Sequence, residues 1–398
     1  MPWNGGSPPK LFATGFNAFD QLSASSKITM TSTIAAGQDD HTFKPFPSGH
    51  EYDLFYRSQD KHPDRVPEIF HATWSTTLLR CGKHLMSLGH QMWADELKGG
   101  EGLHSPFGDT DGLLGCLSGE GRMLYYSQWR NEKGMVRSSK LERERDDEER
   151  PLLSHVTRAG NGRVVVTFKQ TPNAKLTHVA EFASLEDFRR WHKDPAAEGK
   201  YPAVHHMVGG RPKQLIANAA NFVMLMEGGE VYTWGDPRFR TLARPTTGEG
   251  SVPASQAGFV EALGGLKIEK VACGAGHGWL SAALSEDGAV YLWGTSLPGG
   301  EAEIRCLKEA AAGEVVLVEL PAAEDGAEPE DVLDVGVGTN HVALVTASGR
   351  LCVVGVNKNG QLGLGSEQTS FPDWTEVTGM SKVQRVFCAP KATFMHTG

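Results

Sequence analysis

The sequence predicts an all-β protein, a seven-bladed β-propeller closed by N- and C-terminal strands that share one blade. The prediction starts from a recurring pattern: a turn glycine, a short apolar strand, and a second glycine six residues after the first. It is clearest at Gly229 to Gly235, at Gly288 to Gly294 and at Gly349 to Gly355. One such segment is typical of a β-hairpin, whereas several copies indicate a repeat architecture.

The composition agrees with a turn-rich β protein and limits its partners. The 398 residues include 47 glycines and 21 prolines, and 39% of them are hydrophobic. The formal charge of −9 argues against direct binding to nucleic acid phosphates. The N-terminus lacks an apolar stretch of signal-peptide length, and no run approaches a membrane span. We therefore expect a soluble chain of the cytoplasm, the nucleus or both, without membrane contact.

The six cysteines are widely separated and form no Cys-x-x-Cys pair. Five of them fall within or beside predicted strands, which is typical of small buried side chains. We expect free thiols in a reducing compartment rather than disulfides or a metal site. The cysteines are Cys81, Cys116, Cys273, Cys306, Cys352 and Cys388.

The first half of the chain contains weaker copies of the pattern. Ile69–Gly89 is the first, with Gly82 as its turn glycine, and the next two centre on Gly121 and Gly162. In a tight hairpin, glycine adopts a positive φ that would strain a residue with a Cβ atom. With the three clear copies, the chain holds six complete units.

The seventh unit is predicted to be divided between the two ends of the chain. Val386–Ala389 and Lys391–Thr397 are predicted strands that stop at the turn glycine Gly398, and Lys10–Gly15 supplies the strand that should follow. Pairing N-terminal with C-terminal strands holds a propeller shut by hydrogen bonds and removes open sheet edges. Seven units of about four strands each therefore predict a closed ring.

Equivalent positions in the repeats also indicate how the blades pack. Phe222–Leu225, Ser281–Leu284 and Val342–Val345 carry small and apolar residues, so we expect these strands to crowd around the axis. Trp234 and Trp293 occupy equivalent places, which favours packing between blades over a cofactor site.

We expect residues 1–398 to form a single propeller domain with inserts at about 131–150, 170–200 and 298–331. The first insert has mixed charges and few apolar residues and is interpreted as a solvated loop. The second contains a capped amphipathic pattern, Ser184–Asp194, predicted to be a short helix on the rim; partner docking through Trp191 is the alternative. The third holds ten acidic residues against two basic ones, and its middle is compatible with a strand.

Motifs for catalysis and cofactor binding are not found in the sequence. It lacks a phosphate loop, Gly-x-Ser-x-Gly, His-Glu-x-x-His and zinc-finger spacing, so we predict a non-enzymatic protein without cofactor or bound metal. His205 and His206 are adjacent on a predicted strand and point to opposite faces, which disfavours a shared metal. The turn Asp236–Arg240 combines basic and aromatic residues, either as a solvated loop or as a contact for an acidic partner.

The inner hairpin turns should converge on one face of the ring, near the axis. Side chains from distant repeats would then be neighbours, and we predict that this face or the acidic insert binds a protein partner. Trp191 is a further candidate for that role. The partner-binding residues predicted on the face are Trp74, Asn221, His277, Trp279 and His341.

Several segments resemble repeats of the regulator of chromosome condensation family: Val271–His277, Leu284–Gly288, Tyr291–Gly294 and Asn359–Gly365. The resemblance is strong over residues 214–398 and 10–22 and weak over residues 23–213. It implies a seven-bladed propeller closed as described above, which binds proteins through its faces and loops. The family's histidine eight residues before the turn glycine survives here only as His341.

The single-propeller layout is similar to two subgroups of this family. One is the fungal alpha-tubulin suppressor propeller, which implies a small metal-binding partner and an accessory role in diphthamide synthesis and tRNA wobble-uridine modification. The other is an animal relative that partners a JmjC-type oxygenase. A guanine-nucleotide exchange factor for a small GTPase is less favoured, because its wedge and acidic–histidine face are not recognisable. The negative charge disfavours a chromatin-associated regulator.

Overall fold

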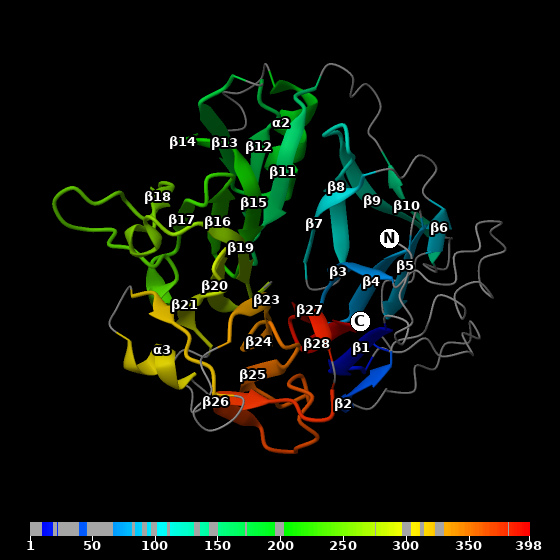
Figure 1. The fold of residues 1–398 in the computed structure, drawn as a ribbon. Helices are drawn as coiled ribbons and strands as arrows, with labels where there is room; N and C mark the ends of the chain where they lie inside the picture. Colours follow the sequence, from blue (N-terminus) through cyan, green and yellow to red (C-terminus); the bar gives the residue numbers. More distant parts are fainter. Residues whose placement is uncertain are drawn as a thin grey trace.

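The structure, a computed structural model of the chain, contains seven four-stranded antiparallel sheets arranged around a central axis (Figure 1). The predicted seven-bladed β-propeller is therefore confirmed. None of the described helices combines the length and apolarity needed to cross a membrane. The structure describes residues 10–18, 22, 40–45, 67–81, 84–89, 94–96, 102–109, 112–130, 136–142, 150–171, 173–195, 203–274, 276–296, 304–310, 314–322, 330–380 and 382–398.

Within each blade the strands follow one another from the axis outward, and the innermost strands of neighbouring blades contact each other. Blade 1 contains β3 (Glu68–Ala72), β4 (Thr76–Cys81), β5 (His84–Gly89) and β6 (Ala94–Glu96). Blade 2 contains β7 (His104–Gly108), β8 (Leu113–Leu117), β9 (Met123–Arg130) and β10 (Val136–Glu142). Blade 3 contains β11 (Leu153–Arg158), β12 (Val164–Phe168), β13 (Leu176–Phe182) and β14 (Val204–Gly209).

Blades 4 to 6 repeat this order. Blade 4 contains β15 (Pro212–Ala217), β16 (Asn221–Met226), β17 (Val231–Gly235) and β18 (Gly258–Phe259), followed by the 3-10 helix η3 (Glu261–Leu263). Blade 5 contains β19 (Ile268–Cys273), β20 (Trp279–Ser285), β21 (Val290–Thr295) and β22 (Val316–Leu317). Blade 6 contains β23 (Val332–Val337), β24 (His341–Thr346), β25 (Leu351–Val356) and β26 (Ser370–Glu376).

Blade 7 closes the ring with strands from both ends of the sequence, as predicted. Its inner pair is β27 (Val383–Ala389) and β28 (Ala392–Thr397), and its outer pair is β1 (Lys10–Gly15) and β2 (Asp40–Pro45). Strands β1 and β28 are paired along their whole length, from Lys10 opposite Thr397 to Gly15 opposite Ala392. The hydrogen bonds of this ladder therefore join the two ends of the chain.

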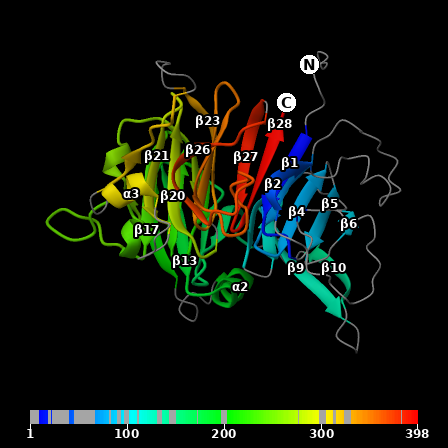
Figure 2. The same cartoon turned by 90° about the horizontal axis from the view of Figure 1, so that it is seen from below.

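Two sets of turns lie on opposite sides of the ring. In each blade the first turn joins the innermost strand to the second strand, and the second turn leads from the second strand to the third. We call these sides the first-turn face and the second-turn face. The end of β28 lies on the second-turn face, whereas helix α2 (Leu185–Lys193) lies on the first-turn face (Figure 2).

The apolar strands expected at the axis are instead the second strands of their blades, so this expectation was wrong. Strands β16, β24 and, apart from its first residue, β20 are buried throughout because blades cover both of their faces. The innermost strands alternate buried and exposed residues, as in β27, because one side faces the axis. A continuous apolar strand thus indicates burial on both faces and not proximity to the axis.

The sequence pattern aligned Gly162 with the glycines of the second turns, and this alignment was wrong. Gly162 lies in the first turn of blade 3, between β11 and β12, whereas the other described turn glycines of complete copies lie in second turns. Asn161 beside it donates a backbone hydrogen bond of 2.8 Å to Ala219 in the first turn of blade 4. Because Gly162 also has a positive φ (92°), glycine spacing alone does not distinguish the two turns. Gly82 lies outside the described residues.

Steric constraints explain why the repeat has glycine at these two positions, and blade 5 shows them best. Gly288 has φ of 80°, and a Cβ atom on it would lie 2.5 Å from the Cβ atom of Asp331 at the entry to blade 6. Gly294 has φ of 95°, and its Cβ atom would collide with the carbonyl oxygen of Trp279 on the paired strand. The first glycine therefore allows the next blade to approach, and the second allows β20 and β21 to pair closely.

The ranges expected to be inserts each contribute a blade strand as well: β10, β13 and β22 lie within them. The predicted helix is present as α2, where the Ser184 hydroxyl accepts a 3.1 Å hydrogen bond from the backbone N–H of Asp187. A second helix, α3 (Arg305–Glu309), lies in the acidic range and was not predicted.

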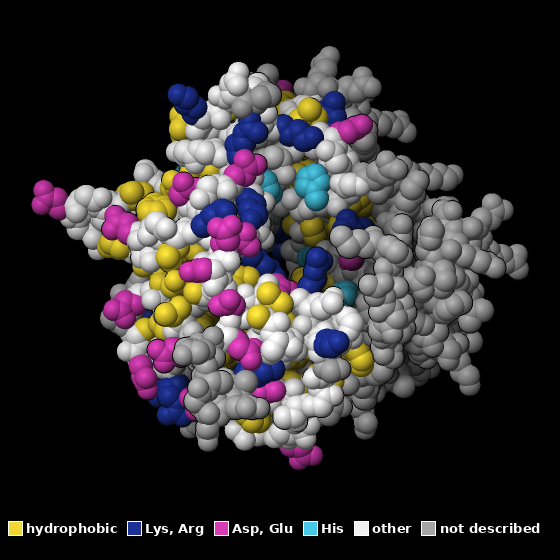
Figure 3. Space-filling view, viewed as in Figure 1, with side chains coloured by type: hydrophobic (Ala, Val, Ile, Leu, Met, Phe, Trp, Pro, Cys, Tyr) yellow, Lys and Arg dark blue, Asp and Glu magenta, His cyan; other side chains and the backbone are white. Residues whose placement is uncertain are grey.

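Polar residues near the start of the innermost strands link successive blades. The Gln214 side-chain oxygen accepts a 2.9 Å hydrogen bond from Val271 N–H, and Lys270 Nζ lies 2.6 Å from Asp334 Oδ1. Asp334 Oδ2 accepts a 2.9 Å bond from Val386 N–H. On this second-turn face, acidic and basic side chains are intermixed around a hollow at the axis (Figure 3).

The predicted packing role of the repeated tryptophans is confirmed. Trp234 Nε1 donates to Glu181 Oε2 in blade 3 at 2.9 Å, and Trp293 Nε1 donates to the carbonyl of Thr241 in blade 4 at 3.0 Å. Both indoles are fully buried, so each one joins its own blade to the preceding blade.

Candidate functional site

First turns from neighbouring blades meet on one face. Ala219 N–H of blade 4 donates to the Gly278 carbonyl of blade 5 at 2.9 Å, and Thr339 N–H of blade 6 donates to the Pro390 carbonyl of blade 7 at 3.2 Å. All five residues predicted on the face lie in these turns or at the next residue. Their exposure differs, however, and this difference separates wall residues from surface residues.

Asn221 and His341 are fully buried and therefore lie inside the wall of the ring. Asn221 Nδ2 donates to Asn218 Oδ1 at 3.3 Å. His341 Nε2 lies 3.0 Å from the Thr393 hydroxyl of blade 7. Burial lowers the pKa of His341 to about 4, so its imidazole is neutral at pH 7. Asn221 therefore braces the first turn of its own blade and His341 links blade 6 to blade 7, and neither has surface for direct contact with a partner.

Trp191 is also a packing residue, because it contacts aromatic side chains of blade 3. It lies in α2, only 6% exposed, with its ring centroid 5.2 Å from that of Phe182 and 5.8 Å from that of Phe168. Phe188, one turn earlier, is fully buried. The apolar face of the helix therefore covers blade 3, and Trp191 offers little surface to a partner.

Trp74 lies where blade 7 meets blade 1. Its half-buried ring lies 5.8 Å from the ring of Phe16, and Lys391 Nζ lies 5.6 Å from its centroid. A cation over an indole face is a favourable arrangement. Trp74 therefore contributes to ring closure while keeping part of its surface accessible.

His277 and Trp279 lie on the accessible surface of blade 5. His277 is exposed and Trp279 is half-buried at the start of β20. Trp279 packs against Phe239 of blade 4, with ring centroids 4.7 Å apart. Phe239 belongs to the 3-10 helix η2 (Arg238–Arg240), and the Arg238 guanidinium lies 5.7 Å from its ring centroid. We call Arg238, Phe239, His277 and Trp279 the aromatic platform.

The backbone beneath the platform is strained. Phe239, Arg240 and Ala243 have φ of 61°, 59° and 53°, in the left-handed region that non-glycine residues rarely adopt. Each such residue costs about 1–3 kcal/mol and persists only where its surroundings hold it, commonly at functional sites. Thr241 contributes to this restraint, because its hydroxyl donates to the Asp236 carbonyl at 2.7 Å.

The acidic insert supplies the main restraint through α3. Arg240 Nη1 donates to the carbonyls of Leu307 and Ala310, at 3.0 and 2.8 Å, at the C-terminal end of this helix. At the other end of α3, Arg305 forms a two-pronged contact with Asp373 of β26, at 2.6 and 2.7 Å. Helix α3 thus spans from the platform loop of blade 4 to the outer strand of blade 6, and the two regions predicted to bind a partner are physically connected.

The contact between Phe239 and Trp279 is the part of the site that sequence reasoning missed. The basic and aromatic turn was recognised as a candidate contact, but nothing in the repeat pattern pairs it with a residue 40 positions later. Only the proximity of two blades creates the platform.

The sequence also contains two adjacent histidines and six cysteines, which are residue types that bind metals or react as thiols. His205 is exposed and His206 is buried beside Glu181, so the adjacent pair points to opposite faces as predicted. Across the described residues, no group of three or more His, Cys, Asp and Glu side chains is arranged to hold a metal. Five cysteines are free, and burial raises the pKa values of Cys116, Cys273 and Cys388 to about 12. The side chain of Cys81 lies outside the described residues.

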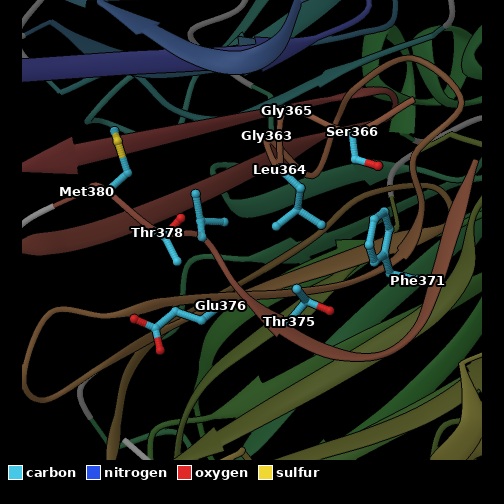
Figure 4. A pocket seen from close by; sticks show the side chains of 10 residues that line it. Gly363, Leu364, Gly365, Ser366, Phe371, Thr375, Glu376, Thr378 and Met380 are labelled. Carbon is cyan, nitrogen blue, oxygen red and sulfur yellow. The ribbon is translucent and has the colours of Figure 1, made fainter. Parts of the chain in front are cut away.

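A cavity of about 490 Å³ opens on the outer side of blade 6 (Figure 4). Its walls come from the loop 363–366 and from Phe371, residues 375–378 and Met380. Glu376 is the one ionisable residue of this lining, and Arg350 Nε donates to its carboxylate at 2.9 Å. The cavity therefore lacks a group of side chains that suggests catalysis.

Seven four-stranded blades, the last of them closed by strands from both chain ends, define a seven-bladed β-propeller. The sequence profile of the regulator of chromosome condensation (RCC1) repeat matches residues 228–280, from the second turn of blade 4 to β20. This match agrees with the resemblance that the motifs of the sequence indicated, and it covers one repeat of the chain.

The chain is also similar to curated proteins that carry this repeat in their names. Mouse RCC1 domain-containing protein 1 is 30% identical over 218 residues, which are 47% of this chain and 55% of that protein. The chain spans about half the length of the curated relatives it matches.

Two solved structures share the fold over nearly the whole chain. Prp20p from Saccharomyces cerevisiae has a TM-score of 0.56 at 12% identity and covers 98% of this chain and 91% of its own; its binding to Gsp1p and histones has been described. Human WBSCR16 has a TM-score of 0.58 at 14% identity, with 98% of both chains covered. At these identities the likeness concerns the fold alone.

Proposed function

We propose that this chain is a non-enzymatic interaction propeller that binds a protein partner through the aromatic platform. The single observation that carries the proposal is the Phe239–Trp279 pair, half-exposed and 4.7 Å apart on a backbone held in a strained conformation. Strain that is retained by several hydrogen bonds favours a functional role over a passive loop.

The platform has the composition of an interface hot spot. Tryptophan and arginine are enriched among residues that dominate binding energy, and rigid aromatic side chains lose little entropy on binding. The platform is also preorganised, because Arg240 fixes the loop to α3 before any partner arrives. His277 and Arg238 at its edge can donate hydrogen bonds to acceptor groups of the partner.

The finer identity of the partner comes from the resemblance noted in the sequence. We favour a small metal-binding protein and an accessory role in diphthamide synthesis and tRNA wobble-uridine modification, in the cytoplasm or nucleus. Exchange of guanine nucleotide on a small GTPase is the second candidate, since Prp20p, which shares the fold, binds Gsp1p. No direct nucleic acid contact is part of the proposal.

The proposal is tested by affinity purification from native lysate, with partners identified by mass spectrometry and their affinities then measured with purified proteins. Phe239→Ala and Trp279→Ala should each weaken the affinity for the partner at least about 30-fold, which is the loss expected for a hot-spot residue. Leu333→Ala is the matched control, because Leu333 is 55% exposed but lies on the innermost strand β23. Equal binding by all three variants would contradict the platform as the site.

The choice between the two candidates needs a separate measurement. Nucleotide release from a panel of small GTPases is followed with the purified chain, which should not accelerate it. Acceleration that Trp279→Ala abolishes would replace the accessory role by an exchange function.

A further inference from the structure

Two histidines and a methionine share one face of the outer strands of blade 3. His178 on β13 stands directly opposite Met207 on β14, and Ala180, two residues further along β13, stands opposite His205. Residues paired across an antiparallel ladder point to the same side, as do residues two apart on one strand. His178, His205 and Met207 therefore lie next to one another on the same side of the sheet.

The two imidazoles already meet. His178 Nε2 lies 2.7 Å from His205 Nδ1, and the ring centroids are 4.9 Å apart. Phe168 of β12 stacks on His178, with centroids 4.9 Å apart and planes 21° from parallel. Trp191 of α2 in turn meets Phe168 edge-on at 5.8 Å. The position of the pair is thus set by a sheet and by a packed aromatic row, not by a flexible loop.

The surroundings of the pair are accessible and apolar. Met207 is 60% exposed, and Leu176, two residues before His178 on the same side of β13, is 54% exposed. These two are among the most exposed large apolar side chains described in the molecule. An ion can therefore reach the pair from solvent, and Met207, opposite His178 in the ladder, supplies a thioether on the same side of the sheet.

We propose that His178, His205 and Met207 bind one Cu(I) ion. Imidazole suits copper, and the soft thioether of methionine selects the monovalent form over harder cations. Zinc prefers a third imidazole, thiolate or carboxylate, and the described residues hold no such group of three. The site is independent of the aromatic platform, which is on blades 4 and 5.

The geometry needs only a small adjustment. Imidazole nitrogens lie about 2 Å from a bound first-row metal, so two of them on one ion are roughly 3–3.5 Å apart. The ion takes the place of the proton that His178 and His205 share, and the rings separate by less than about 1 Å from their present 2.7 Å contact. The displaced proton moves to the other nitrogen of the ring that carried it, so both histidines bind in their neutral forms, and no electron is transferred.

The test titrates the full chain with Cu(I) under anaerobic, reducing conditions, against a chromophoric Cu(I) chelator as competitor. The wild type should retain one equivalent. His178→Gln and His205→Gln should each weaken retention at least about 100-fold, and Met207→Leu, which conserves volume, about 10-fold. His277→Gln removes an exposed histidine elsewhere and should leave retention unchanged.

X-ray absorption at the copper edge distinguishes this site from cysteine binding. The bound ion should show two nitrogen ligands and one sulfur ligand, and a nitrogen ligand should be lost in His205→Gln. An all-sulfur shell, or retention unchanged in His205→Gln, would overturn the proposal. Zn(II) bound as tightly as Cu(I), with no effect of Met207→Leu, would overturn the choice of copper. Because His205 and Met207 are exposed, their variants should melt like the wild type.

Discussion

His341 serves the ring wall rather than a partner. Its imidazole fills the space above Gly338, where any Cβ atom would collide with it, and Nε2 meets the Thr393 hydroxyl at 3.0 Å. Thr393 in turn donates to the Gln361 carbonyl at 2.7 Å, so the contacts run from β24 through β28 to a loop of blade 6. Whether a first-turn side chain faces solvent or the neighbouring blade depends on that blade, which explains why the sequence alone misplaced His341.

Burial of His341 makes folding sensitive to acid. Burial lowers its pKa from 6.5 to about 4, so the unfolded chain binds protons more readily than the folded chain between these values. Stability is therefore complete above about pH 6.5 and falls as the pH drops toward 4, by up to about 3 kcal/mol for a shift of this size. His71, whose pKa burial also lowers to about 4 despite the opposing charge of Asp109, acts in the same direction.

The variant His341→Gln keeps a polar group near Thr393 but does not titrate. Its melting temperature should fall less between pH 7 and pH 5 than that of the wild type, although it starts lower. His71 remains in the variant, so part of the slope should persist. Circular dichroism melts across this range provide the measurement, and identical slopes in both proteins would contradict the assignment.

At the scale of elements, α3 shows how a short helix depends on its surroundings. Its N-cap, Ile304, provides no side-chain hydrogen bond, and five residues are too few for stability in isolation. Ile304 and Leu307 are nearly fully buried against the blades, and Arg240 binds carbonyls at the other end. Helix propensity and capping therefore could not predict α3, whereas the capped, amphipathic α2 was predicted from sequence.

Arg240→Gln should loosen the platform without altering its aromatic residues. The variant loses charged hydrogen bonds to Leu307 and Ala310, and the strained residues Phe239 and Arg240 can then relax. We expect faster amide hydrogen exchange across residues 236–244 and partner affinity about 10-fold weaker.

Arg305→Gln is the matched control for that variant. It breaks an exposed ion pair with Asp373 at the opposite end of the same helix, and such pairs contribute little. Exchange across residues 236–244 should therefore stay at the wild-type rate. If both variants speed exchange equally, the whole insert and not the Arg240 contact supports the platform.

For the whole molecule, repetition determined what could be predicted. The Asn357 side chain accepts a 3.0 Å hydrogen bond from Leu362 N–H, and Asn17 accepts the same bond from Leu22 N–H at 2.8 Å. The same loop thus recurs in blade 6 and in blade 7, and repetition of this kind made seven blades and their closure predictable. The strand β22 in the acidic insert was also anticipated, because the middle of that insert alternates like a strand. The platform and the outer strands β10 and β13 were not predicted, because they arise from contacts that occur in single blades and leave no repeated signal.

The closure of the ring should depend on Gly15 more than on a glycine at a sheet margin. Gly15 has φ of 118°, and a Cβ atom there would collide with the carbonyl oxygen of Lys391 on the other end of the chain. Gly15→Ala should therefore destabilise the fold by about 2 kcal/mol or more and weaken the β1–β28 ladder. An opened blade exposes the edge of β28, so light scattering should also reveal concentration-dependent association.

Gly209→Ala, where nothing lies within 4 Å of the added atom, should change stability by less than about 0.5 kcal/mol. Urea unfolding compares the two variants, and equal midpoints would show that the junction at Gly15 does not hold the ring shut.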